Sequence, residues 1–146
     1  MGTARALNDA EHQLERGDAQ SAPPWVSWMS SADLAVDAGR CWLDLEDPRR
    51  ATVALDEGLG LLAPERVRTR AIMLTYRAHA ALAERDVDAA VSDTRTALDT
   101  ALGTGASRCL DLVRGTLGES LEPHKGETAV RDLRSYAQQR LTSARA

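Results

Sequence analysis

Two stretches of this chain decide its fold: LEDPRRA at residues 45–51 and AERDVDAA at residues 83–90. Both read as a tight turn followed by the start of a helix, and they end on Ala51 and Ala90, which lie 39 residues apart. A third alanine, Ala129, follows after another 39 residues. A period of about 20–50 residues is typical of stacked helical hairpins, because one such unit cannot bury its apolar face alone. The period therefore predicts a helical array.

Small residues keep the same distance from the repeated alanine in the first two copies. Gly39 and Gly58 flank the first alanine, and Ala78 and Ala97 stand at the same offsets around the second. Small side chains let two antiparallel helices approach closely and let the next pair stack on them. We therefore expect the repeated alanines to be buried at helix–helix contacts.

The composition favours an all-α protein. The chain has 146 residues, 43% of them hydrophobic, which is enough for one domain with its own core. Phe is absent and aromatic residues make up only 3%, so the core must consist of Ala, Leu and Val. Segments rich in Ala and Leu and poor in Gly and Pro favour helix. No β-branched run of strand length interrupts them.

Capping signals divide the chain into a terminal helix and three helix pairs. Asp47 with Pro48, and Asp86, are predicted to begin the second helices of the first two pairs. Pro64 is expected to open the fourth helix, and Pro123 to break the sixth. The expected order is an N-terminal helix over 1–17, a linker over 18–26, repeat pairs over 27–63, 64–103 and 104–141, and a frayed tail over 142–146. This order contains about seven helices, in antiparallel pairs that wind into a superhelix.

Charge and cysteine content narrow the function. A net charge of −4 argues against direct nucleic-acid binding, which normally needs a basic surface. No apolar run of about 18 residues and no secretory signal occurs, so we expect neither membrane insertion nor export. Cys41 and Cys109 are too few and too far apart for a disulfide framework, so we expect a cytoplasmic location. No motif predicts a metal or a cofactor.

The repeat resembles the tetratricopeptide repeat, whose skeleton is small–aromatic–small–apolar–small. The matching positions of the first copy are Gly39, Trp42, Ala51, Leu55 and Gly58, those of the second are Ala78, Ala81, Ala90, Thr94 and Ala97, and those of the third are Leu117, Ala129, Leu133 and Tyr136. The second copy matches more weakly, and the third has lost the small residues. The period exceeds the usual value of about 34 residues, so the extra residues should lie in loops or in longer helices.

Residues 24–41, the Arg66-x-Arg68-x-Arg70 run, and residues 84–90 followed by Ser107-Arg108 resemble a narrower group. They are similar to the tetratricopeptide-like C-terminal sensor domain of xenobiotic-response-element-type helix-turn-helix transcriptional regulators from high-GC bacteria. The resemblance covers most of the chain from about Leu7 on. Those regulators carry an N-terminal DNA-binding domain, for which this sequence leaves no room. The resemblance thus implies an excised sensor domain or a stand-alone descendant.

In tetratricopeptide arrays the first helix of each pair lines the concave surface. This resemblance implies a groove that binds a small molecule or a peptide, and its expected binding residues are Arg40, His79, Arg114, Asp33, Thr75, Asp111, Val36 and Leu43. Arg40 and His79 are equivalent positions of neighbouring repeats, so we expect them to converge with Arg114 from the third. The alternative interpretation is that the polar members are ordinary solvated residues on helix surfaces.

Three functions remain open. The first is a ligand- or protein-binding module related to a regulator's sensor domain. The second is a small enzyme of secondary metabolism that performs acid–base or cyclisation chemistry in the groove. His79 would then be the general base, because its pKa lies near operating pH, and Asp111 would orient it. The third is an oligomerisation domain, for instance of a homodimer.

Overall fold

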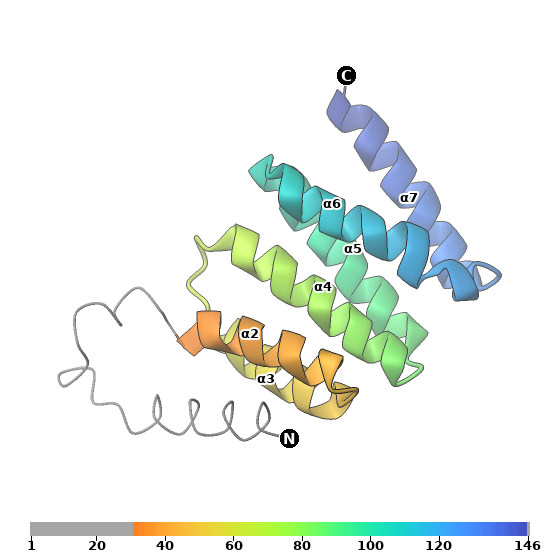
Figure 1. The fold of residues 1–146 in the computed structure, drawn as a ribbon. Helices are drawn as coiled ribbons and strands as arrows, with labels where there is room; N and C mark the ends of the chain where they lie inside the picture. Colours follow the sequence, from red (N-terminus) through yellow and green to blue (C-terminus); the bar gives the residue numbers. More distant parts are fainter. Residues whose placement is uncertain (1–30, 146) are drawn as a thin grey trace, which may run out of the picture.

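The computed structural model describes residues 31–145, and this part of the chain is all-α (Figure 1). Six α-helices, a π-helical turn and a short 3-10 helix account for the regular structure of the described residues. They are α2 (Ser31–Asp44), α3 (Pro48–Leu61), α4 (Val67–Ala83), α5 (Val87–Thr104), α6 (Ser107–Gly115), η2 (Thr116–Ser120, the π turn), η3 (Glu122–His124, the 3-10 helix) and α7 (Thr128–Arg145). The helix and linker predicted over residues 1–26 lie outside the described residues.

Several predicted boundaries shift. The fourth helix begins at Val67 and not at Pro64, because the amide of Arg66 first closes a turn onto the Ala63 carbonyl. The sixth helix leaves α-geometry after Gly115 and continues as the π turn. The tail expected from residue 142 is instead the last turn of α7.

The two turns that carry the sequence repeat form the same hydrogen bonds. In the first, the amide of Asp47 donates to the Trp42 carbonyl, and in the second the amide of Asp86 donates to the Ala81 carbonyl, both at 2.8 Å. Each aspartate also accepts, through Oδ1, the amide three residues later, at 3.2 and 3.1 Å. The residue before each aspartate, Glu46 or Arg85, has a positive φ, 58° and 62°. This is the Schellman ending of a helix followed by an aspartate N-cap. The predicted equivalence of the two turns is confirmed.

Glycine should stabilise either turn at its left-handed residue. A side chain in this conformation is strained, and glycine is not. We expect Glu46→Gly and Arg85→Gly each to raise the free energy of unfolding by about 0.5–1 kcal/mol, measured by urea denaturation. Glu84→Gly is the matched control, because its φ of −89° needs no glycine, and this change should destabilise. Destabilisation by both turn variants would show that neither turn is strained at this position.

The repeated alanines are buried, as predicted. Ala51 and Ala90 are both 0% exposed. A Cβ on Gly39 would lie 2.7 Å from the Leu55 side chain, and one on Gly58 would lie 2.5 Å from the Ala35 Cβ. These two glycines therefore let α2 and α3 pack closely.

The third copy departs from the repeat. The carbonyl of Asp86 accepts the first helical bond of α5, and the carbonyl of Glu127 does the same for α7. These two residues are 41 apart and not 39. Ala129 is therefore not the structural equivalent of the earlier alanines, and it is only half-buried. The residues added by the irregular segment from η2 to η3 displace the register.

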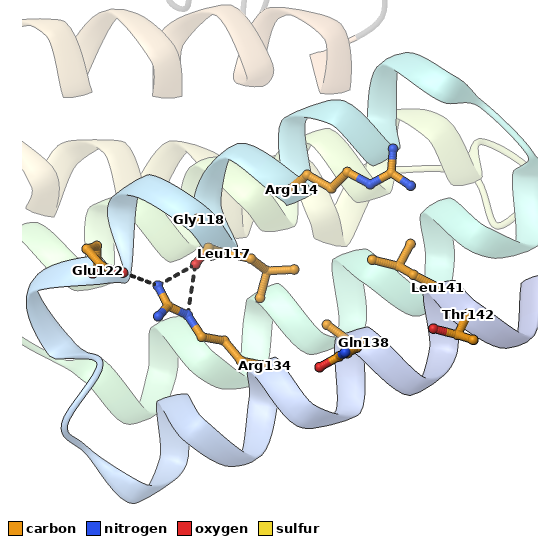
Figure 2. Close-up of a pocket in the computed structure, with 9 residues that line it drawn as sticks. Arg114, Leu117, Gly118, Glu122, Arg134, Gln138, Leu141 and Thr142 are labelled. Carbon is orange, nitrogen blue, oxygen red and sulfur yellow. Dashed lines mark hydrogen bonds and ion pairs between the residues drawn. The ribbon is translucent and has the colours of Figure 1, made fainter.

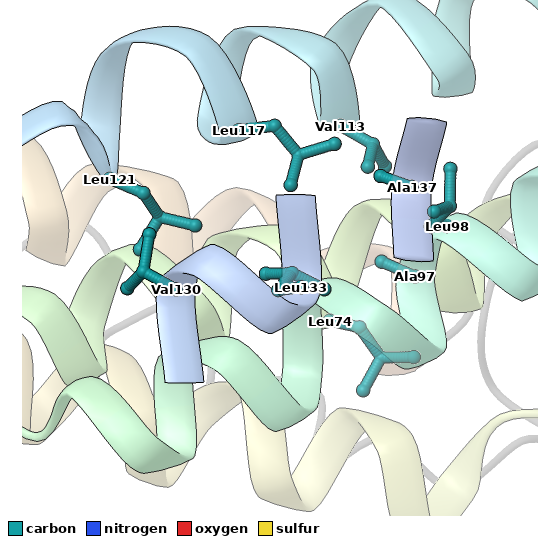
Figure 3. Packing of buried hydrophobic residues seen from close by; sticks show 9 residues of the cluster. All are labelled: Leu74, Ala97, Leu98, Val113, Leu117, Leu121, Val130, Leu133 and Ala137. Atoms are coloured by element: carbon teal, nitrogen blue, oxygen red, sulfur yellow. The ribbon is translucent and has the colours of Figure 1, made fainter. Parts of the chain in front are cut away.

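Helix α4 is central to the described fold, since it contacts α2, α3, α5 and α6. The first two hairpins, α2–α3 and α4–α5, are closely packed along their length. The third is not: α7 packs on α5, and Figure 1 shows α6 and α7 diverging from the η3 connection. The largest buried cluster joins both arms of this divergence to α4 and α5 (Figure 3); its members are Leu74, Ala97, Leu98, Val113, Leu117, Leu121, Val130, Leu133 and Ala137.

Candidate functional site: the groove between α6 and α7

The divergence of α6 and α7 leaves an open groove of about 630 Å³. One wall comes from α6, η2 and η3, and the other from a single face of α7 (Figure 2). The lining residues are Arg114, Leu117, Gly118, Glu122, Arg134, Ala137, Gln138, Leu141 and Thr142. A volume of this size falls in the range of ligand sites, about 300–1,000 Å³.

The π turn builds the closed end of the groove. The amide of Leu121 bonds to the Thr116 carbonyl, five residues back, where an α-helix would use Leu117. The Leu117 carbonyl instead accepts the Nε and Nη2 groups of Arg134 on α7, at 3.1 and 2.8 Å. Arg134 thus ties α7 to the π turn at the point where the two walls meet (Figure 2). π turns of this kind often mark functional sites.

Glu122 completes this clamp. Its carboxylate accepts Nη2 of Arg134 at 2.9 Å and also pairs with Lys125 at 3.2 Å. The hydrogen bond from Arg134, followed by that from Lys125, lowers the pKa of Glu122 below its usual value. The charge of this carboxylate is therefore already met within the protein.

Beyond the clamp the groove has an apolar floor and a basic rim. Leu117, Ala137 and Leu141 supply the apolar surface. Arg114 lies on the rim with its side chain 43% exposed, and its partner among the described residues is the exposed Asp111, at 3.7 Å. Exposed pairs of this length contribute little, so this guanidinium can exchange Asp111 for a ligand's anion.

His79 lies elsewhere, on α4 against the π turn. Its Nε2 is 2.8 Å from Oγ1 of Thr116, which lies 3.2 Å from the Leu112 carbonyl. Burial lowers the pKa of His79. Thr116 and Arg114 are two positions apart on one helical segment, so they point to nearly opposite sides. The structure therefore separates His79 from Arg114, which we expected to converge.

The remaining predicted site residues are also dispersed. Thr75 is 1% exposed and donates to the Ala71 carbonyl, so it belongs to the interior and does not line a surface groove. Asp33 pairs with Arg66 through two hydrogen bonds. Arg40 is exposed on α2. The apolar members, Val36 and Leu43, are half-buried and pack against two separate core clusters.

Of the predicted residues, the groove contains only Arg114. The sequence argument missed the α7 wall because it took the first helices alone as ligand-facing. A signal was present: Arg134, Gln138 and Leu141 recur at helical spacing and form one side of α7.

A second hollow of about 360 Å³ lies over α3, α4 and α5. Arg77 of α4 lies in it and bonds both to Asp93 of α5 and to Asp56 of α3. These bonds raise the pKa of Arg77, the Asp93 bond most strongly. The arrangement ties three helices together and uses the charges it contains.

Comparison with known proteins adds no identity. No protein-family model, no curated protein and no solved structure matches this chain. Within residues 31–145 no cluster of three or more His, Cys, Asp or Glu side chains could hold a metal ion. None of the helices in this part is long and apolar enough to cross a membrane. Cys109 is buried and Cys41 half-buried, and both are free thiols.

Proposed function

We propose that this chain is a binding module: a tetratricopeptide-like helical scaffold that holds a ligand or a segment of another protein between α6 and α7. The observation that carries the proposal is the open third hairpin. The same kind of hairpin is closed in α2–α3 and in α4–α5, so an open one exposes surface that its equivalents bury. Its resemblance to regulator sensor domains agrees with a role in sensing a ligand or a partner.

The composition of the groove supports binding. Ligand sites are concave and mostly apolar, with a few polar groups that fix orientation. Here three apolar residues form the floor, while Arg114, Gln138 and Thr142 stand at the edges. The clamp between Arg134 and the Leu117 carbonyl holds the two walls at a fixed separation, so the groove exists before a ligand arrives. A preformed site avoids the cost of ordering its walls on binding.

Two neighbouring glutamines provide the test. Gln138 and Gln139 are both exposed on α7, but only Gln138 lines the groove. Gln138→Trp should fill the groove, and Gln139→Trp should add the same side chain outside it. The immobilised protein would be screened against phage-displayed random peptides and, by thermal shift, against a library of small organic acids.

We expect ligands that bind the wild type and Gln139→Trp but lose at least about tenfold in affinity for Gln138→Trp, which corresponds to the loss of one good anchor. Circular dichroism and thermal melts would establish that both variants are folded. If every ligand recovered from both libraries binds the two variants equally, the groove is not a binding site.

A further inference from the structure

We propose that the occupant of the groove is an acidic amphipathic helix of a partner protein. This inference rests on the proposed function and names the partner's chemistry. It follows from the shape of the two walls, from the space beside Gly118 and from the charge at the rim.

The walls are shaped for a helix. On α7 the lining residues Arg134, Ala137 and Leu141 follow the spacing i, i+3 and i+7. On the opposite wall Arg114 and Leu117 are three apart, and the wall ends at Glu122, eight residues after Arg114. Eight residues correspond to about 12 Å, or slightly more than two helical turns. A groove between two helix faces of this length is typical of the helix-in-groove mode, in which apolar anchors at i, i+3 or i+4, and i+7 fill the space.

Gly118 leaves room for close approach. A Cβ built on this residue would meet no atom within 4 Å, so nothing in the described structure fills the space beside it. Gly118 is nevertheless part of the groove wall. A backbone can therefore approach this wall more closely than it could approach a wall with side chains at every position, as small residues at helix–helix contacts allow.

The rim selects acidic flanks. The negative charge of Glu122 is matched by Arg134 and Lys125. Arg114 is held only by its long contact to the exposed Asp111, and no other acidic residue lines the groove. A ligand carboxylate at this rim would form a charge-assisted, potentially bidentate pair with the guanidinium, stronger than the contact it replaces. A partner helix with Asp or Glu beside its apolar stripe therefore fits, and one with Lys or Arg there is repelled.

The experiment selects peptides of about 15 residues from a helix-favouring phage library, a length at which isolated helices become stable enough to bind. The full-length protein would be used as wild type, as Arg114→Glu and as Arg108→Glu. Arg108 is the matched control, because it is exposed on the same helix but does not line the groove. Enriched peptides would be synthesised with a fluorophore and titrated by anisotropy at low and high salt.

We expect the wild-type pool to show apolar residues at i, i+3 or i+4, and i+7 with Asp or Glu beside them. Arg114→Glu should weaken these peptides at least about tenfold, which is the value of one charge-assisted bond, and Arg108→Glu should leave them nearly unchanged. Peptides in which one flanking acid is changed to Lys should recover binding to Arg114→Glu. Peptides that compete with Gln138→Trp but are extended, lack the periodicity, or respond equally to both arginine variants would overturn the acidic helix while leaving the groove as a site. Recovery of small acids alone would do the same. Failure of Gln138→Trp to affect any ligand would instead overturn the proposed function.

Discussion

Leu55→Thr should lower the free energy of unfolding by about 2–4 kcal/mol, and adding Gly39→Ala to this variant should restore part of the loss. Leu55 is fully buried, and its Cγ and Cδ2 fill the space where a Cβ of residue 39 would lie. The second repeat solves the same contact differently, with Ala78 opposite Thr94. A larger residue on one helix thus accompanies a smaller one on the next.

A double-mutant cycle tests this exchange. Gly39→Ala alone should cost about 1–3 kcal/mol, because Leu55 must move, although alanine favours helix. In the double variant the new methyl group occupies the cavity, and the threonine can donate to the Ala51 carbonyl, as Thr94 donates to Ala90 at 2.7 Å. The coupling measured by urea denaturation should therefore favour the double variant by at least about 1 kcal/mol.

Gly60→Ala is the control for helix propensity. Gly60 is exposed and has open space around its Cβ position, so this change should stabilise slightly, by about 0.5–1 kcal/mol. If the costs of Gly39→Ala and Leu55→Thr simply add, the two repeats are not interchangeable at this contact, and the 39-residue register would lose its energetic meaning.

The local parts of the fold could be predicted because their causes are local. A helix ending and an aspartate cap within four residues specify each turn, so residues 45–51 and 83–90 identified both hairpins. The buried alanines followed from the period. The π turn could not be found in this way, since Gly115 and Gly118 weaken an α-helix without specifying what replaces it. Its form depends on Arg134, which lies 16 residues beyond Gly118.

The candidate site was harder still, because it depends on the angle between two helices. The argument from tetratricopeptide arrays assumed that all three hairpins close alike, which would place Arg40, His79 and Arg114 on one surface. The added residues between α6 and α7 change that angle, turn Arg114 toward α7, and expose a groove that the repeat pattern does not contain. Position 75 shows a second limit: a threonine is polar by type, yet its hydroxyl is satisfied by its own helix and the residue is buried.

Arg77→Ala should cost about 2–4 kcal/mol, a loss comparable to that of a core truncation. Arg77 donates through Nε and Nη2 to Asp93, both at 2.8 Å, and the side chain of Asp93 is only 13% exposed. Removing the guanidinium leaves this carboxylate in a largely buried place without its counter-charge. For fully buried pairs such a loss costs about 3–5 kcal/mol, and the partial exposure of Arg77, 30%, reduces it.

The first repeat again indicates how the loss can be reversed. Its residues equivalent to Arg77 and Asp93 are Ala38 and Ala54, and both are buried. Arg77→Ala with Asp93→Ala would recreate that apolar pair, and replacing an ion pair by apolar residues is often neutral. We therefore expect the double variant to recover at least about half of the cost of Arg77→Ala. Asp56→Ala is the control, because this second partner of Arg77 is 54% exposed and its loss should cost less than about 1 kcal/mol. Urea denaturation of the four variants measures all of these terms. A double variant less stable than Arg77→Ala alone would mean that Asp93 stabilises the α4–α5 hairpin without Arg77, and that the ion pair does not explain its burial.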